Sequence, residues 1–269
     1  MQVELWGASL ASDFALPERP VAWALLLVYG LTLALAIFHL RSRSPRTSQR
    51  LHRWGLTFLL ALVAIFTRHL FLIEFYPESQ LPPLFLAQNP VVGLAPFGFL
   101  PMMLAGALFG PLQALFVGFV DGLSRAVGQS QQILDPFQMA LVAGFAALLL
   151  RQRFSGRLYS LLRQPIIVGL LAAVMLDLFI AFASFAYAQA SASDLAALDL
   201  ALSTSYAFLL PLLLEGALGG LWLMLIQSGV PQLKPEGAYT PAPFSDSLTK
   251  RLLATFVLFA VLLNFVILV

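Results

Sequence analysis

The stretch GALFGPLQALFVGFVDGLSR, residues 106–125, decides the fold of this chain. It contains the end of one apolar helix, a break at Gly110-Pro111, and a second apolar helix that carries Asp121 and Arg125. Small residues recur at every fourth position, on one stripe of a helix: Gly106, Gly110, Ala114, Gly118 and Gly122. In lipid, such a stripe lets two helix backbones approach closely. The stretch therefore predicts a membrane hairpin with a tight small-residue seam.

The composition of the whole chain agrees with a membrane protein. Of its 269 residues, 60% are hydrophobic and only 10% are charged, and the mean hydropathy is +0.88. The pI near 9.2 does not indicate nucleic-acid binding, because twelve of the fifteen lysines and arginines lie in three connecting segments. Such clustering is a signal of membrane topology. The absence of cysteine excludes disulfides, thiolate metal sites and cysteine nucleophiles.

The hydropathy pattern predicts an all-α polytopic bundle of about eight transmembrane helices. The expected spans are Val21–Leu40, Trp54–Ile73, Val91–Phe109, Pro111–Gly128, Pro136–Leu150, Pro165–Ala188, Ser203–Ile226 and Leu252–Val269. The three basic segments, 41–53, 151–163 and 234–251, all fall on the cytoplasmic side if the N-terminus is outside. The sequence thus predicts a multi-pass protein of the bacterial inner membrane. Asp135 is expected to be the N-cap of its span, with Pro136 at the first helical position.

Five segments follow from this topology. Residues 1–20 form an external segment, residues 21–53 the first span with its Arg-rich loop, and residues 54–228 a six-helix membrane core. Residues 229–251 are a cytoplasmic linker and residues 252–269 a final outward span. Because that span ends on Val269 without a polar flank, we expect a further domain to follow it.

Several ionisable residues fall inside the expected spans, where they are costly and normally face protein or a water-filled cavity. They are Arg68, His69, Asp121, Arg125, Asp177 and Glu215. Apart from His69, they lie about 15–20 Å from the inner ends of their spans, given a rise of about 1.5 Å per residue. Two interpretations are open: ion pairs that hold the bundle together, including one between Asp121 and Arg125, or a polar pocket that opens to the outside. Nothing has catalytic or metal-binding spacing, so we expect no enzyme activity, no cofactor and no metal.

The region from Asn89 to Phe154 resembles the five-helix membrane sensor region of LytS-type histidine kinases. The resemblance rests on Gly110-Pro111, Gly118, Gly122-Leu123-Ser124-Arg125, a polar turn and a short helix that ends in Arg151. The six-helix core is also similar to the S components of energy-coupling-factor vitamin transporters, with one helix added at each end. The second resemblance implies a closing loop at 74–90 and a ligand pocket that involves Arg68, Asn89, Arg125 and Gln129.

Our leading expectation is a membrane-embedded sensor or ligand-binding module of a bacterial signal-transduction protein. The alternatives are the substrate-binding component of a vitamin-type transporter, or a structural subunit of a membrane complex. A transporter would present small-residue surfaces to its ATPase partner, for which Ala143/Ala147 and Gly169/Ala173 are candidates. The expected partners are the lipid bilayer and a small-molecule ligand; a homodimer is compatible with this interpretation, and nucleic acid is not expected.

Overall fold

A computed structural model describes residues 17, 19–43, 50–75, 92–130, 132–188, 192–230 and 240–241. Most of these residues are helical. The chain divides into two compact units. We call Met1–Gln152 with Leu162–Glu236 the helical unit, and Arg153–Leu161 with Gly237–Val269 the small unit.

Four helices of the helical unit are long and apolar enough to cross a membrane. They are α1 (Pro20–Arg43), α2 (Arg50–Leu70), α7 (Pro165–Ala186) and α8 (Asp194–Gly229). Their outer faces carry large apolar side chains: Leu27, Phe66 and Leu210 are 73%, 62% and 66% exposed. Extended apolar surface of this kind suits contact with lipid and not with water. The prediction of a mostly helical, membrane-embedded protein is confirmed at this level.

Three further helices are shorter than a usual membrane span. They are α3 (Leu100–Leu108), α4 (Pro111–Arg125) and α5 (Asp135–Arg151), with 9, 15 and 17 residues. A five-residue π-helical segment, η1 (Ala126–Ser130), continues α4. The described residues therefore contain four helices of spanning length and not the eight spans expected; residues 252–269 lie outside the described part of the chain.

The expected span Val91–Phe109 is not a single helix, and that prediction is wrong. Strand β2 (Val92–Leu94) pairs antiparallel with β1 (Ile73–Phe75), which directly follows α2. A turn that contains Pro96 and Gly98 separates β2 from α3. Both residues disfavour a continuous helix, and α3 begins only where Pro101 can occupy the first turn. Nine residues give a helix about 14 Å long, which is too short to cross the hydrocarbon core alone.

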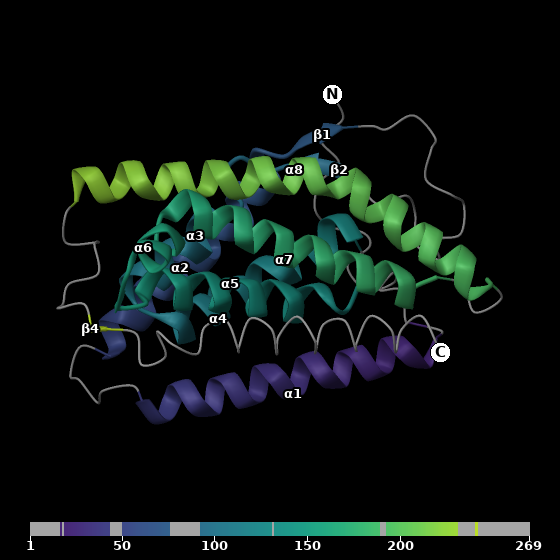
Figure 1. Cartoon of the computed structure of the whole chain (residues 1–269), viewed down its shortest axis with the longest axis horizontal. Helices are drawn as coiled ribbons and strands as arrows, with labels where there is room; N and C mark the ends of the chain where they lie inside the picture. The colour runs from purple at the N-terminus through teal and green to yellow at the C-terminus, as the bar shows by residue number, and fades with distance from the viewer. Residues whose placement is uncertain are drawn as a thin grey trace. The chain divides into compact units, whose positions relative to one another are not determined.

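Helix α8 begins at Asp194 and not at Ser203, where the expected span began. Residues 194–202, expected to connect two spans, are therefore helical, and that prediction is wrong. The Ser193 side chain accepts a hydrogen bond from the backbone N–H of Ala196 at 3.3 Å, and Asp194 lies in the first turn. Both features stabilise a helix N-terminus. At 36 residues, α8 is about 54 Å long. It contains Pro211, an identifiable cause of bending, and it changes direction along its length (Figure 1).

The small-residue stripe lies against α5. A Cβ atom at Gly118 would lie 2.5 Å from both the Ala143 Cβ and the Met139 carbonyl oxygen, and one at Gly106 would lie 2.7 Å from the Ala147 Cβ. At Gly122 it would meet the backbone at the start of α5 at 2.6 Å. The helices can pack this closely because these glycines have no side chain.

Helices α7 and α8 pack side by side in the same way (Figure 1). A Cβ at Gly169 would collide with the Gly216 carbonyl oxygen, and one at Gly216 would collide with that of Gly169. Ala173, one turn from Gly169, is also fully buried, as are Ala143 and Ala147 at the other seam. The small-residue surfaces suggested for an ATPase partner are thus used inside the bundle.

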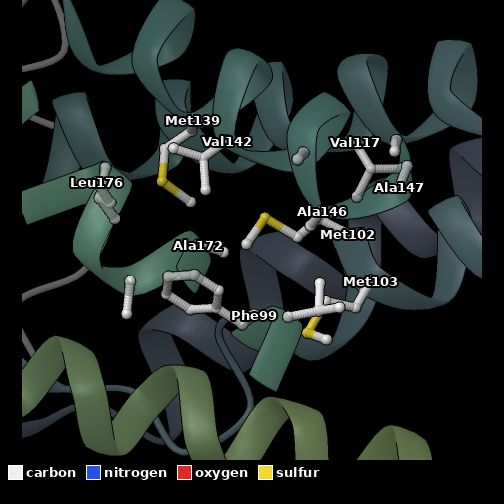
Figure 2. Close-up of a cluster of buried hydrophobic side chains, with 14 of the residues drawn as sticks. Phe99, Met102, Met103, Val117, Met139, Val142, Ala146, Ala147, Ala172 and Leu176 are labelled. Atoms are coloured by element: carbon white, nitrogen blue, oxygen red, sulfur yellow. The ribbon is translucent and has the colours of Figure 1, made fainter. Parts of the chain in front are cut away.

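The apolar core lies among α3, α4, α5, α7 and α8. Figure 2 shows Phe99, Met102 and Met103 in one cluster with Met139 and Val142 of α5 and Ala172 and Leu176 of α7. These side chains are at most 1% exposed. Phe99 is the last residue of the turn before α3. Its burial in this core therefore holds that turn in place next to α8.

The small unit contains very short elements. Strand β3 (Phe154–Ser155) pairs in parallel with β4 (Thr240–Pro241), and α6 (Arg157–Leu162) begins two residues after β3. The rings of Phe154 and Tyr159 lie 5.3 Å apart. The sequence predicted only loop and linker in these segments.

Replacement of Gly110 by alanine is expected to lower the free energy of unfolding by about 1–3 kcal/mol. Gly110 precedes α4 with φ 119° and ψ −178°, a region essentially restricted to glycine. Its nearest neighbour, Arg151 Nη1, would lie 3.5 Å from an added Cβ, so the cost comes from backbone strain. Thermal unfolding in detergent measures it, with Gly30→Ala as the control because its nearest contact is 4.0 Å away. Equal midpoints for the two variants would contradict the prediction.

Candidate functional site

Arg68 and Asp121 form the centre of a charge network inside the helical unit. Arg68 lies near the end of α2 and Asp121 in the second half of α4, and they are 3% and 0% exposed. The Arg68 Nε donates to Asp121 Oδ1 at 2.7 Å, and Nη2 donates to Oδ2 at 2.8 Å. This two-point geometry is the strong form of an arginine–carboxylate pair. Arg68 therefore joins α2 to α4.

Glu215 of α8 approaches the same guanidinium. Its Oε1 lies 3.5 Å from Arg68 Nη2, and its carboxylate also accepts a hydrogen bond from the backbone N–H of Ala95. A Cβ at Gly98 would collide with Glu215 Oε1. Glycine at 98 in the turn before α3 is thus a condition for Glu215 to reach this position. Arg68 lies between two carboxylates, a close one on α4 and a looser one on α8.

A second buried pair lies one turn along α4. Arg125 Nε lies 3.4 Å from Asp135 Oδ2, which also accepts a hydrogen bond from Ser130 Oγ at 2.6 Å. The guanidinium carbon lies 5.9 Å from the centre of the Phe208 ring, within cation–π range. This pair bridges η1, so it fixes the turn between α4 and α5 and adds a contact to α8.

Two sequence interpretations need correction here. The i, i+4 spacing of Asp121 and Arg125 suggested that they pair with each other, but each pairs with a residue from another helix. Asp135 is not the N-cap of α5: Leu134 occupies that position, and Asp135 is the first helical residue. Sequence reasoning consequently left Asp135 out of the site. Its position ten residues after Arg125, across a short polar turn, was the available signal.

Two of the remaining predicted site residues, His69 and Asp177, have hydrogen-bond partners outside the Arg68–Asp121–Glu215 set. The side chain of His69 shares a 2.8 Å hydrogen bond with Ser124 Oγ, on the neighbouring turn of α4. Asp177 of α7 instead accepts a hydrogen bond from Ser205 of α8 at 2.6 Å. Asn89 lies outside the described residues, as does the side chain of Gln129, whose backbone belongs to η1.

The network has an unequal number of charged groups. Two guanidinium groups, of Arg68 and Arg125, face three carboxyl groups, of Asp121, Asp135 and Glu215. All five side chains are at least nine-tenths buried. Both arginines are engaged by carboxylates of the chain itself, so an anionic ligand would have to displace one of them. Within the described residues, no group of three or more His, Cys, Asp or Glu side chains has the arrangement of a metal site.

The described part of the chain has a cavity of about 330 Å³ between α1 and helices α4, α5 and α7, away from the charge network. Its walls are almost entirely apolar and include Leu115, Leu141, Phe145 and Phe179. It does not contain any of the charged residues of the network. A polar solute therefore does not fit its chemistry.

Fold and site together define a mostly helical, membrane-embedded protein with a buried interhelical charge network. Comparison with known proteins gave no match to a family, to a curated protein or to a solved structure.

Proposed function

We propose that the chain is the membrane-embedded sensor module of a bacterial signal-transduction protein, located in the inner membrane with its N-terminus outside. The observation that carries the proposal is the position of Arg68 between Asp121 of α4 and Glu215 of α8. A buried ion pair contributes little net stability compared with apolar packing. Ionisable residues within a membrane bundle are by default candidates for function.

The geometry provides a means of switching. Arg68 binds Asp121 at 2.7 Å and stands 3.5 Å from Glu215, so a small displacement exchanges its close partner. Such an exchange would loosen the contact of α2 with α4 and tighten its contact with α8. A π-helical segment at the end of α4 supports this view, since π-helical turns often occur at functional sites. Helix α8 leads toward residue 230 and would transmit the change along the chain.

A switch needs a ligand or a membrane state that favours one arrangement over the other. Arg125 and Asp135 are the groups through which a small ion would act, because their 3.4 Å pair is looser than the Arg68–Asp121 pair. The transporter alternative is less well supported. Its small-residue docking surfaces are buried within the bundle, and both arginines are occupied by carboxylates.

Spin-label distances in lipid nanodiscs test the proposal. The chain has no cysteine, so Phe66→Cys on α2 and Leu210→Cys on α8 would introduce the only two thiols, both at exposed positions. Asp121→Asn weakens the bond between Arg68 and its close partner, and it is expected to shift the distance distribution between α2 and α8. Glu215→Gln, which weakens the looser partner, is expected to leave it unchanged. If Asp121→Asn, Glu215→Gln and the labelled protein with its network unchanged all gave the same distance distribution, the proposal would be wrong. The charges would then only hold the bundle together, as in a structural subunit.

Ligand identity calls for a separate measurement on the same material. Inorganic phosphate, sulfate, sodium, magnesium, riboflavin and thiamine are screened for an increase in thermal unfolding midpoint. A compound that binds only the folded state stabilises it by mass action. The increase should disappear in Arg125→Ala, and its persistence there would remove Arg125 from the site.

A further inference from the structure

Asp177 is an isolated carboxyl group in the middle of a membrane-spanning helix. It is the thirteenth of the 22 residues of α7, about 18 Å from the start of the helix and about 14 Å from its end. The residue is 5% exposed. Its Oδ2 lies 2.6 Å from Ser205 Oγ, and its Oδ1 is buried without a hydrogen-bond partner among the described residues.

No described cation neutralises this carboxyl group. Helices α1, α5 and α8 pack against α7. Their described ionisable side chains are Tyr29, His39, Arg41, Asp135, Arg151, Asp194, Asp199, Tyr206 and Glu215. None of these forms an ion pair or hydrogen bond with Asp177 in the part of the chain that the structure describes. Glu215 lies ten positions along α8 from Ser205, about 15 Å away along the helix axis, and Tyr206 is 85% exposed on the outer face.

The surroundings also decide which ligand the carboxyl group can hold. An ionised carboxylate without a partner is strongly disfavoured in an apolar medium, and the bilayer core offers no water to replace one. A hard metal cation such as Ca²⁺ or Mg²⁺ requires about six or more oxygen ligands. Asp177 and Ser205 together supply three oxygen atoms. A proton needs only one of them.

We propose that Asp177 and Ser205 form a proton-binding site within the membrane, separate from the Arg68 network. Binding converts the Asp177 carboxylate and one proton into the neutral acid. Protonation reverses the hydrogen bond that the carboxylate accepts from Ser205: the proton lies on Oδ2 and is donated to Ser205 Oγ. Oδ1 then becomes an uncharged carbonyl oxygen that is much less costly to bury. The site joins α7 to α8, so loss of the proton places a negative charge at the contact between these two helices.

Infrared spectroscopy of the whole chain in lipid vesicles tests the site, with the proton itself as the probe. At neutral pH the difference spectrum of wild type minus Asp177→Asn should contain the C=O stretching band of a protonated carboxylic acid. The band should shift in D₂O and disappear as the pH is raised. Asp199→Asn serves as the control, because it removes an exposed carboxyl group from α8, and the Asp199→Asn protein should retain the band.

Ser205→Ala supplies a second readout in which Asp177 is kept. Loss of the hydrogen bond should move the acid band to higher frequency without removing it. The proposal would be overturned if the neutral-pH difference spectrum contained only carboxylate bands, or if Ser205→Ala left the acid band unmoved. Circular dichroism of each variant establishes that the bundle is folded.

Discussion

Replacement of Arg68 by methionine is expected to reduce the free energy of unfolding by about 3–5 kcal/mol. The substitution keeps much of the side-chain volume but leaves Asp121 without its guanidinium, and it removes the cation from Glu215. Both acids are almost completely buried, so water cannot replace the lost partner. Removal of one member of a buried ion pair is costly for this reason. Titration with sodium dodecyl sulfate in mixed micelles, followed by circular dichroism, measures the loss.

A double variant separates the pair from the rest of the site. Arg68→Met/Asp121→Leu removes both charges, and it should be more stable than Arg68→Met alone, because apolar replacement of a whole buried pair is often neutral. The two single variants and the double variant form a cycle whose coupling should reach about 1–3 kcal/mol. Arg53→Met on the same helix is the control, since Arg53 is only half-buried, and it should stay within about 0.5 kcal/mol of wild type. A loss of less than about 1 kcal/mol in Arg68→Met, well below the usual cost of breaking a buried pair, would show that the network does not hold the helices together.

Alanine at Gly169 is expected to cost about 3 kcal/mol or more, at or above the upper end of ordinary overpacking. The added Cβ would collide with the carbonyl group of Gly216. That neighbour is backbone of another helix and cannot rotate away, so α7 and α8 must separate along their contact. Gly216→Ala should have a similar effect because the contact is reciprocal.

Gly55→Ala is the matched control for this seam. Gly55 also lies in a membrane-spanning helix, but nothing lies within 4 Å of a Cβ added there. Alanine at this position should be neutral, or stabilising by up to about 1 kcal/mol through its helix propensity. Thermal unfolding of the variants in one detergent compares them directly. If Gly169→Ala were as stable as Gly55→Ala, the close backbone contact between α7 and α8 would be wrong.

The sequence by itself determined the class of the protein and several of its helices. Length, hydropathy and the four-residue spacing of small residues depend on neighbours along the chain, and they predicted α1, α2, α7 and the break at Gly110-Pro111 within a few residues. The buried charges Arg68, Asp121, Arg125, Asp177 and Glu215 were also recognisable. Polar side chains stand out against an apolar helix whatever the packing is.

Only the tertiary structure decided which of these residues act together. Arg125 is four residues from Asp121 but pairs with Asp135 beyond η1, while Asp121 pairs with Arg68, fifty-three residues away. Which charged residues pair depends on how the helices pack, and the close contacts at Gly118 and Gly169 determine that packing. Apolar count alone likewise could not divide residues 91–109 into β2, a turn and α3. The pairing of β2 with β1 is a non-local contact, and hydropathy contains no information about it.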